Sequence, residues 1–549
     1  MNVLDRIIGA ISPGWGARRM ASRMAVGQMT KMLDAGKHDR TSPHIAPNTS
    51  GEIRDQAELI RARDRAWRMY FNDSNARKFV DQTVAHVVGC GQKPQSKATK
   101  PNGEPDALFR QAANDLFRLV SANLLYNPTT GAPSMPFGVV QAMVMKEVAI
   151  CGEVAIRKRY LSRDRAVKEG RVLPIAIELI TTEHFLDSVP NLPRSVAKGN
   201  YIFRGIEFDP QGNRVAYHIR KMHPSDPRTL AWNTEIERVP ASEILHVFRP
   251  QRPESIRGVT WMSSLIQRLQ QIRDYEETEL IAATVSACVA MAITRPSGST
   301  LPSLQNPTNE RTVDADGNPI TRMQPGMFLD LRPGQQVTGF NPQRPNTSAD
   351  AFIGTLMRGA SLGMPGIKSS TVTADYRNSS FSSERSAEND AWREIEIVQE
   401  WFAAWFCQPI WEFVIETGLT EGWFREVLDG RSVRLERAIA DKQRVMSCEW
   451  MGPVPKSINP ADDERASQMA IQIGTSSLPI ECAARGLDWE QVMEDQKRVA
   501  DKRKELGIAD PDALAAGVVD ANGKPIDHGN SDANQGGNDG SDGQAKTAA

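Results

Sequence analysis

One pattern in the sequence matches a catalytic motif, G-x-S-x-G, which in hydrolases presents a nucleophilic serine on a sharp turn between a strand and a helix. The match is Gly359-Ala360-Ser361-Leu362-Gly363. The residues before it have helical spacing and those after it are polar and loop-like, which reverses the order that a nucleophile needs. We therefore interpret the motif as a chance match.

The sequence also contains no recognisable motif for binding a metal ion or a nucleotide. The eight histidines are scattered, and only His86, four residues before Cys90, comes near ligand spacing; two candidate ligands do not make a zinc site. The six cysteines lie far apart, which favours reduced thiols over a disulfide framework. The pairs Gly36-Lys37 and Gly523-Lys524 lack the rest of a phosphate-binding loop. The sequence thus predicts no enzyme, no metal and no cofactor.

Charge is almost balanced over the 549 residues, with 66 basic against 67 acidic side chains. A protein held to nucleic acid by its global charge should be strongly basic, so the balance argues against that class. Locally the charge is uneven. Through Lys78 there are 14 Lys or Arg against 8 Asp or Glu, which fits either a solvated face or a contact with nucleic acid or an acidic partner.

Four carboxylates cluster on one predicted helix: Asp274, Glu276, Glu277 and Glu279. With Arg268 and Arg273 they leave residues 259–282 with a net charge of −2. Their spacing is more typical of a solvated acidic face than of an acid–base pair.

Hydrophobic periodicity predicts helices in the first part of the chain and then strands. The helical segments are 51–88, with a break at Asn72-Asp73-Ser74, then 105–126 and 139–151. Between 153 and 249 the apolar residues alternate with period two, and segments 201–208 and 214–220 flank turn residues 209–213. The expected fold class is α+β.

Two long helices follow, separated by an irregular segment. Residues 259–290 contain no Pro or Gly and would form a helix of about 45–50 Å. Segment 294–346 is rich in Pro, Gly, Asn and Thr and is expected to be a small β module. A helix over 349–362, a polar loop over 363–381 and a second long helix over 382–418, kinked at Pro409, complete this part.

The second long helix carries an apolar stripe and four tryptophans, Trp392, Trp401, Trp405 and Trp411. A core-facing helix is the favoured interpretation, and an aromatic platform that stacks nucleic-acid bases is the alternative.

Neither end of the chain nor its apolar runs predict export or membrane insertion. The apolar stretch near the N-terminus has five residues, too few for a signal peptide. The longest uncharged apolar run, 280–293, has fourteen residues and is too short to span a bilayer. Residues 510–549 hold seven acids, two lysines and no aromatic residue, a composition that predicts disorder.

The order of several short motifs resembles the portal proteins of lambda-type tailed bacteriophages and related prophages. The motifs span roughly residues 55 to 495: Arg61-Ala62-Arg63 through Val87-Val88-Gly89, Gly205-Ile206-Glu207-Phe208-Asp209, Val215-Ala216-Tyr217, His246-Val247-Phe248-Arg249-Pro250, Arg257-Gly258-Val259, Asp375-Tyr376, Ser382-Ser383-Glu384-Arg385, Gly452-Pro453 and Gly486-Leu487-Asp488. Phe381 stands where such a protein is expected to have a tyrosine.

The resemblance implies a ring-shaped homo-oligomer, usually a dodecamer, at one capsid vertex, through which double-stranded DNA is packaged and ejected. Its implied partners are terminase, then a head–tail connector protein, and the major capsid or scaffold protein. The expected location is the virion, with assembly in the host cytoplasm.

The resemblance also implies a layout of the subunit. The expected parts are a basic N-terminal arm (1–50), an α/β wing (51–258), a stem helix (259–293), a β-rich clip (294–346), second stem and wing helices (347–434) that include a channel loop (363–381) and the long wing helix (382–418), a helical crown (435–509) and an acidic tail (510–549).

Two sets of charged residues are candidates for contact with DNA in such a ring. The loop offers Lys368, Asp375 and Arg377, whose basic groups either touch phosphates in passing or, in the case of Arg377, pair with Asp375. The acidic face of the stem helix, Asp274, Glu276, Glu277 and Glu279, would repel the DNA backbone or is simply solvated.

Two other functions stay open at this point. One is a nucleic-acid-processing enzyme of the packaging machinery, which would need a carboxylate metal cluster or a nucleotide loop. The other is a capsid or tail adaptor that forms no channel.

Overall fold

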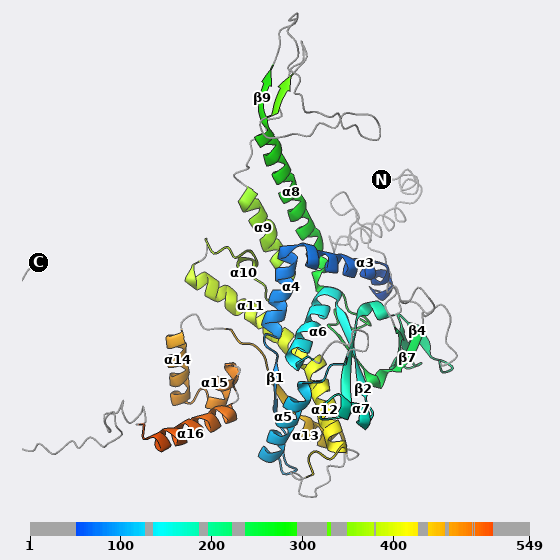
Figure 1. Cartoon of the computed structure of the whole chain (residues 1–549), viewed down its shortest axis with the longest axis vertical. Helices are drawn as coiled ribbons and strands as arrows, with labels where there is room; N and C mark the ends of the chain where they lie inside the picture. Colours follow the sequence, from blue (N-terminus) through cyan, green and yellow to red (C-terminus); the bar gives the residue numbers. More distant parts are fainter. Residues whose placement is uncertain are drawn as a thin grey trace, which may run out of the picture. The chain divides into compact units, whose positions relative to one another are not determined.

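The 549-residue chain was analysed as a computed structural model, shown in Figure 1. The structure describes residues 51–126, 135–185, 196–221, 236–293, 327–330, 349–377, 380–425, 438–455, 460–485, 487 and 489–508. The chain divides into two units, Met1–Glu58 and Leu59–Ala549, and the contacts reported below lie in the second.

The first helices end where the sequence predicts. Helix α3 (Gly51–Asn72) and helix α4 (Ser74–Val87) are separated by Asp73, whose side chain accepts a hydrogen bond from the Ala76 N–H at 2.8 Å and so begins α4. Helix α5 (Ala107–Ser121) forms within its predicted range, and α6 (Phe137–Cys151) begins two residues before its predicted start at 139.

Two antiparallel sheets follow. The first has the order β3-β2-β8 and the second β4-β5-β6-β7. Their strands are β2 (Glu153–Tyr160), β3 (Ile175–Ile180), β4 (Tyr201–Phe203), β5 (Ile206–Phe208), β6 (Arg214–Arg220), β7 (Ile236–Pro240) and β8 (Ile244–Phe248). With the short helix α7 (Arg163–Lys168) they confirm a mixture of helices and strands.

Segment 201–208, predicted as one strand, is a tight hairpin. Arg204 and Gly205 both have positive φ, at 50° and 78°, and reverse the chain between β4 and β5. Paired residues with φ above zero are characteristic of two-residue hairpin turns. The period-two pattern is the same on both sides of the turn, so it gave no sign of the reversal.

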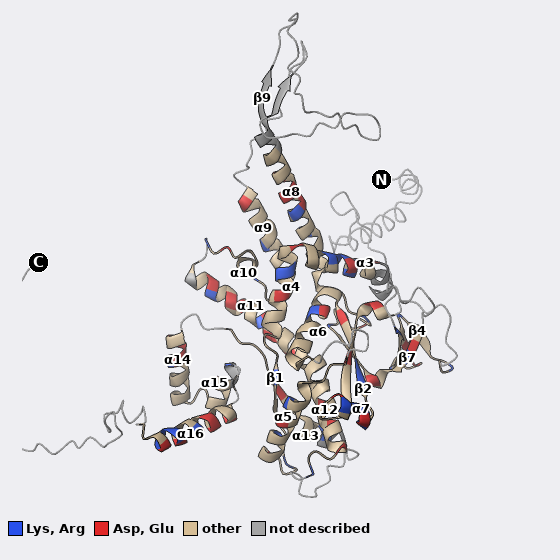
Figure 2. Cartoon of the chain, in the orientation of Figure 1, with Lys and Arg blue, Asp and Glu red and all other residues tan. Residues whose placement is uncertain are grey.

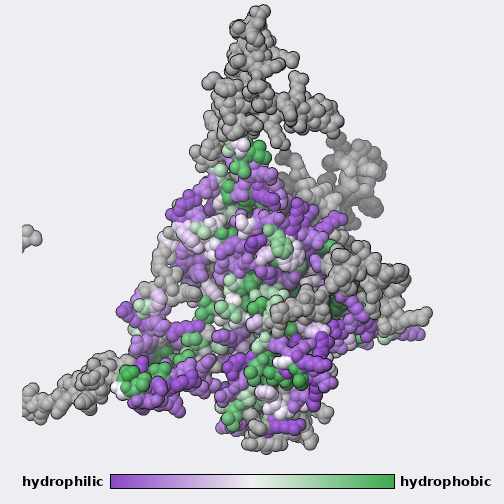
Figure 3. All heavy atoms as spheres, viewed as in Figure 1, coloured by the Kyte–Doolittle hydropathy of each residue, from purple (hydrophilic) through white to green (hydrophobic). Residues whose placement is uncertain are grey.

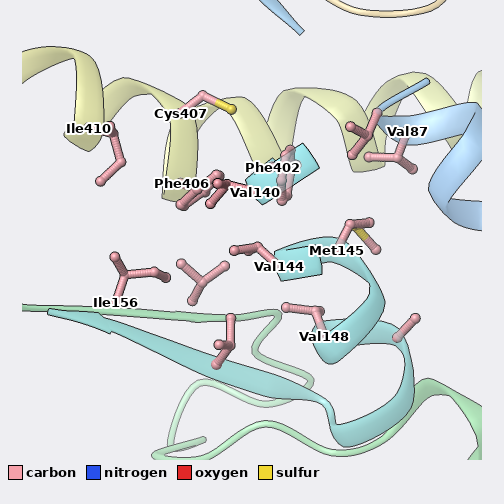
Figure 4. Close-up of a cluster of buried hydrophobic side chains, with 14 of the residues drawn as sticks. Val87, Val140, Val144, Met145, Val148, Ile156, Phe402, Phe406, Cys407 and Ile410 are labelled. Atoms are coloured by element: carbon pink, nitrogen blue, oxygen red, sulfur yellow. The ribbon is translucent and has the colours of Figure 1, made fainter. Parts of the chain in front are cut away.

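The long helix predicted over 382–418 faces the core. It consists of α11 (Phe381–Phe402), a π-helical turn (Ala403–Cys407) and α12 (Gln408–Thr420). Phe402, Phe406 and Ile410 are fully buried against side chains of α6 (Figure 4). The core-facing interpretation of the apolar stripe is therefore confirmed.

The irregular turn in this helix lies just ahead of the predicted kink at Pro409. Pro409 occupies the first turn of α12, where its missing N–H costs no helical hydrogen bond. Two of the four tryptophans are buried, Trp392 and Trp411, whereas Trp405 is 37% exposed.

The predicted stem helix is shorter than expected. A 3-10 turn (Trp261–Ser264), begun by the Thr260 side chain, precedes α8 (Ile266–Cys288), whose 23 residues span about 34 Å. The chain is already extended at β9 (Val289–Ile293), which pairs in parallel with β10 (Met327–Asp330). Most of segment 294–346, the expected β module, lies outside the described residues.

Helix α9 (Ala349–Ser361) packs beside α8 and gives the G-x-S-x-G motif a structural explanation. A side chain at Gly359 would overlap the Arg268 guanidinium of α8, and one at Gly363 would lie 2.7 Å from Leu265 Cδ2. The two glycines thus allow close helix packing, and Ser361 has no role as a nucleophile in this arrangement.

The remaining elements are mainly helical, as predicted, with one strand pair that the sequence did not reveal. Strands β1 (Lys93–Ser96) and β11 (Cys448–Met451) pair in antiparallel fashion across about 350 residues. The helices are α13 (Ala438–Met446), α14 (Pro460–Ile473), α15 (Leu478–Ala484) and α16 (Trp489–Leu506).

No helix among the described residues is long and apolar enough to cross a membrane. The described surface in Figure 3 is mostly hydrophilic, with separate hydrophobic patches.

Candidate functional site

The loop over 363–381 is anchored at its base to helix α11. The Gly366 N–H donates to Glu394 Oε2 at 2.7 Å, and Lys368 Nζ pairs with Glu384 at 3.2 Å and with Glu388. Burial acts to lower the pKa of Lys368, but the hydrogen bonds and charges of the two glutamates outweigh it and raise that pKa. Lys368 is therefore protonated and held in place, and the two glutamates compensate its positive charge.

The middle of the loop is more ordered than a polar loop was expected to be. It contains a short helix, α10 (Ser369–Thr373), which ends at Ala374 with φ at 54°. This left-handed residue redirects the chain and begins the exposed tip, Asp375, Tyr376 and Arg377.

Within the tip, Asp375 and Arg377 neutralise each other. Arg377 donates from Nε and Nη2 to the two oxygens of Asp375, at 2.9 and 2.8 Å, and also reaches Asp350 of α9 at 3.1 Å. These hydrogen bonds lower the pKa of Asp375 to about 2, so its carboxylate is charged at neutral pH. Of the two interpretations of Arg377, local pairing is the arrangement in this structure.

The three predicted loop residues share one groove. An open groove of about 1010 Å³ between α9, the loop and α11 is lined by Lys368, Asp375 and Arg377. The remaining lining combines apolar side chains of α9 with carboxylates of α11. Figure 2 shows acids and bases interleaved along the neighbouring helices.

The four predicted stem acids lie on α8 but not on one face. Successive residues of an α-helix are rotated by about 100°, so Asp274 and Glu277 point to one side while Glu276 and Glu279 point to another. Asp274, Glu276 and Glu277 are exposed, and Glu279 is partly buried. Partial burial, together with the nearby Asp73 charge, raises the pKa of Glu276.

A densely bonded charged group that sequence reasoning did not single out is Glu153. Its side chain is fully buried and contacts Arg63 and Arg257, each at 2.6 Å, and His246 at 3.0 Å. The Gly258 N–H donates to the same carboxylate at 2.7 Å.

These contacts join distant parts of the chain at one point. Arg63 lies on α3, Glu153 begins β2, and Arg257 lies in the segment that leads to α8. Gly152 and Gly258 make the approach possible, because a side chain at Gly258 would lie 2.1 Å from the Gly152 carbonyl oxygen. The Glu153 centre is therefore a structural junction.

Electrostatics at this junction follow from burial and pairing. Burial opposes the charged form of Glu153, but Arg257, Arg63 and His246 outweigh it and hold its pKa well below its usual range. Burial lowers the pKa of His246 to about 4, so the imidazole is neutral at pH 7. A buried carboxylate with two arginines suits a rigid scaffold.

A second buried carboxylate, Glu207 of β5, holds the other sheet. Arg238 donates to it at 2.7 and 3.1 Å, Asn200 at 2.7 Å, and His218 lies at 3.3 Å. The Arg238 hydrogen bonds lead the effects that lower the pKa of Glu207 to about 2, against the opposing effect of burial.

A third junction joins the end of α4 to α11 and to the segment that follows β11. Gly89 has φ at 56°, and a side chain there would lie 2.7 Å from Pro453 Cγ. Gln399 Nε2 of α11 donates to the carbonyl oxygens of His86 and Pro453, at 2.8 and 2.9 Å. Several motif residues quoted above therefore meet in pairs or clusters: Arg63, His246 and Arg257 around Glu153, and Gly89 with Pro453.

No group of three or more metal-ligating side chains occurs among the residues that the structure describes. Cys90, Cys151, Cys407, Cys448 and Cys482 are free thiols. Cys288 lies among residues whose side chains the structure does not describe.

Comparison with known proteins identifies the family. The family model for lambda-family phage portal proteins matches residues 37–399. The chain belongs to the lambda family of phage portal proteins.

Curated relatives agree with this family. The chain is 26% identical over 455 residues to a probable portal protein of Halomonas phage phiHAP-1, covering 82% of each chain. It is 22% identical to portal protein B of Escherichia phage lambda, covering 57% of this chain and 60% of that protein, and 20% identical to the portal protein of Escherichia phage N15, covering 60% and 64%.

The solved structures with similarity include chains from gene transfer agent particles. A chain from the virion of a native particle has 12% identity and a TM-score of 0.33, and covers 79% of this chain and 92% of that one. A chain from the neck of a native particle has 12% identity and a TM-score of 0.34, with 77% and 90% covered.

The family match and the curated relatives support a phage portal function for this chain. They name only portal proteins, and none of them names a catalytic family.

Proposed function

We propose that this portal protein assembles into a closed homo-oligomeric ring, a dodecamer, at one capsid vertex, and that double-stranded DNA passes through the ring during packaging and ejection. The observation that carries the proposal is the family match over residues 37–399. Assembly takes place in the host cytoplasm. Terminase docks first and a head–tail connector protein replaces it, while the rim of the ring contacts the major capsid or scaffold protein.

The proposed layout assigns each part of the chain a place in the ring. Residues 51–258 form the wing, α8 the stem, residues 294–346 the clip that meets terminase and the connector, and residues 435–509 the crown. The Glu153 and Glu207 centres support this assignment because they make the wing rigid around two buried carboxylates.

The loop over 363–381 is proposed to face the channel. Its base is fixed by Lys368 on α11, and its tip is exposed and carries no net charge because Arg377 is paired with Asp375. Each phosphate that a protein neutralises adds a salt-dependent hold on DNA. A tip with its arginine already paired would touch a passing duplex without holding it.

The acids of α8 are proposed to weaken the hold of the channel on DNA as well. A surplus of two negative charges per subunit, repeated around the ring, would disfavour phosphates at the wall and keep the duplex central. Both features fit a conduit that must let DNA slide.

Negative-stain electron microscopy of the purified chain tests the proposal. We expect ring-shaped particles with a central opening. A stable monomer at micromolar concentration would contradict the proposal, and a closed disc without an opening would favour a capsid or tail adaptor.

A further inference from the structure

Helix α3 presents an exposed basic stripe. Arg61, Arg65 and Arg68 recur at spacings of four and three, and all three are exposed. The opposite side of the helix is in the core, where Ala66 and Met69 are buried. Asp64, at the flank of the stripe, is the one acid between residues 59 and 72.

These arginines lack a partner within the described part of the subunit. None of their guanidinium groups forms an ion pair or a hydrogen bond with another residue that the structure describes. By contrast, Arg63 on the inner side of the same helix is fully engaged with Glu153. Apolar side chains border the stripe, since Ile60 is 48% exposed and Phe71 is 63% exposed.

Helix α8 presents the complementary pattern. Asp274 and Glu277 share the face of α8 that points away from the buried Leu269 and Ile272. Asp274 accepts one hydrogen bond from Gln270, at 2.7 Å, and neither acid is ion-paired within the described residues. One turn further on, Ile281 is 56% exposed, so this face also joins acids to an apolar residue.

We propose that the basic stripe of α3 (Arg61, Arg65 and Arg68) contacts the acidic face of α8 (Asp274 and Glu277) of a neighbouring copy of this chain. Two different, complementary patches on one chain make a head-to-tail contact, and such contacts close into rings when the rotation between copies allows it. Ile60 and Phe71 on one side and Ile281 on the other provide the apolar part of the contact.

This interface rests on the proposed ring and refines it. It gives Asp274 and Glu277 a protein partner, so these two acids no longer count toward the surplus of negative charge proposed for the channel wall.

The test is a charge-reversal exchange in the full chain, read by sedimentation velocity and electron microscopy. The variants are R61E/R65E/R68E, D274R/E277R, and the five substitutions combined. We expect each one-sided variant to reduce the fraction of ring at least tenfold at 0.15 M NaCl, and the combined variant to recover it to within twofold of the unmodified chain. R118E/R163E/R165E reverses three arginines of α5 and α7 that are exposed or half-exposed and should leave the ring fraction unchanged.

The outcomes separate this interface from the ring itself. An unmodified chain that forms no ring contradicts the proposed function. Rings that persist in both one-sided variants contradict the interface but not the proposed ring. The same holds if R61E/R65E/R68E weakens DNA binding while the rings persist. If both one-sided variants fold by circular dichroism and lose the ring, but the combined variant does not recover it, the two faces do not contact each other and the interface is again wrong.

Discussion

Two arginine–carboxylate pairs in this subunit have nearly the same length and very different surroundings. Glu153 and Arg257 lie 2.6 Å apart with side chains that are 0% and 1% exposed, whereas Asp375 and Arg377 lie 2.8 Å apart with side chains that are 39% and 69% exposed. In water an ion pair contributes little, because solvent screens the charges. In the core, loss of one partner leaves the other charge without compensation.

The comparison shows that burial, more than distance, separates a structural ion pair from an exposed one in this chain. The Glu153 centre joins segments up to 195 residues apart and fixes their geometry. The loop tip keeps its charges near water, where they can exchange partners at little cost. Lys368, which is 18% exposed, lies between these two cases.

The largest effect is expected at Glu153. The substitution Glu153→Gln removes the charge that compensates Arg63 and Arg257, and should lower the free energy of unfolding by about 3–5 kcal/mol. Guanidinium denaturation followed by tryptophan fluorescence measures it. Asp375→Asn removes a carboxylate from a similar pair in water and serves as the matched control; a loss at Glu153 no larger than that of the control would remove the distinction between the two pairs.

Acid should destabilise the second buried centre. The pKa of Glu207 is about 2 in the folded chain against an ordinary value of 4.5. The unfolded chain therefore takes up a proton first, and the contribution of Glu207, complete above pH 4.5, is lost as the pH falls from 4.5 to 2. Thermal melting across this range should show a shallower loss in Glu207→Gln than in the unmodified chain. Equal slopes would contradict the assignment.

An intermediate effect is expected at Lys368. Lys368→Met removes the salt bridges to Glu384 and Glu388 and should cost about 1–2 kcal/mol. The loop should also open more often, so chymotrypsin should cleave faster after Tyr376, which is 54% exposed. The control is Lys97→Met, which breaks an exposed salt bridge to Glu449. Unchanged cleavage would mean that Lys368 does not anchor the loop.

The smallest effect on stability is expected at the tip. Asp375→Asn should change the free energy of unfolding by less than about 0.5 kcal/mol, as for other exposed pairs. It should nevertheless leave Arg377 available for phosphate, and each new phosphate contact should steepen the salt dependence of DNA retention by about 0.9 in the log–log slope. Filter binding over a salt series measures that slope, with Asp390→Asn as the control for an exposed acid of α11. An unchanged slope would show that Arg377 does not reach DNA.

Local signals in the sequence were sufficient for most elements. Asp73 predicted the break between α3 and α4 because its side chain caps the second helix, and the apolar stripe of α11 and α12 predicted its buried face. The hairpin at Arg204 and the strand pair of β1 with β11 were not predicted. The first is a turn inside a uniform alternation, and the second joins four residues to a partner about 350 residues away.

The candidate sites were likewise predicted only in part. Lys368, Asp375 and Arg377 could be chosen because they are the charged residues of one loop, but their anchors on α11 and α9 could not. Glu153 carried no local signal, since its partners come from α3, β8 and the segment before α8. The four acids of α8 looked like one face in the sequence, and the helical rotation divides them into two.

The most direct test of the account is an electron cryo-microscopy reconstruction of the assembled chain at a resolution that shows side chains. It should show a closed ring with a central opening, in which every subunit places Asp375 and Arg377 on the wall of the opening while Glu153 stays buried in the wing. A ring whose 363–381 loops lie on the outer surface, away from the opening, would contradict the account.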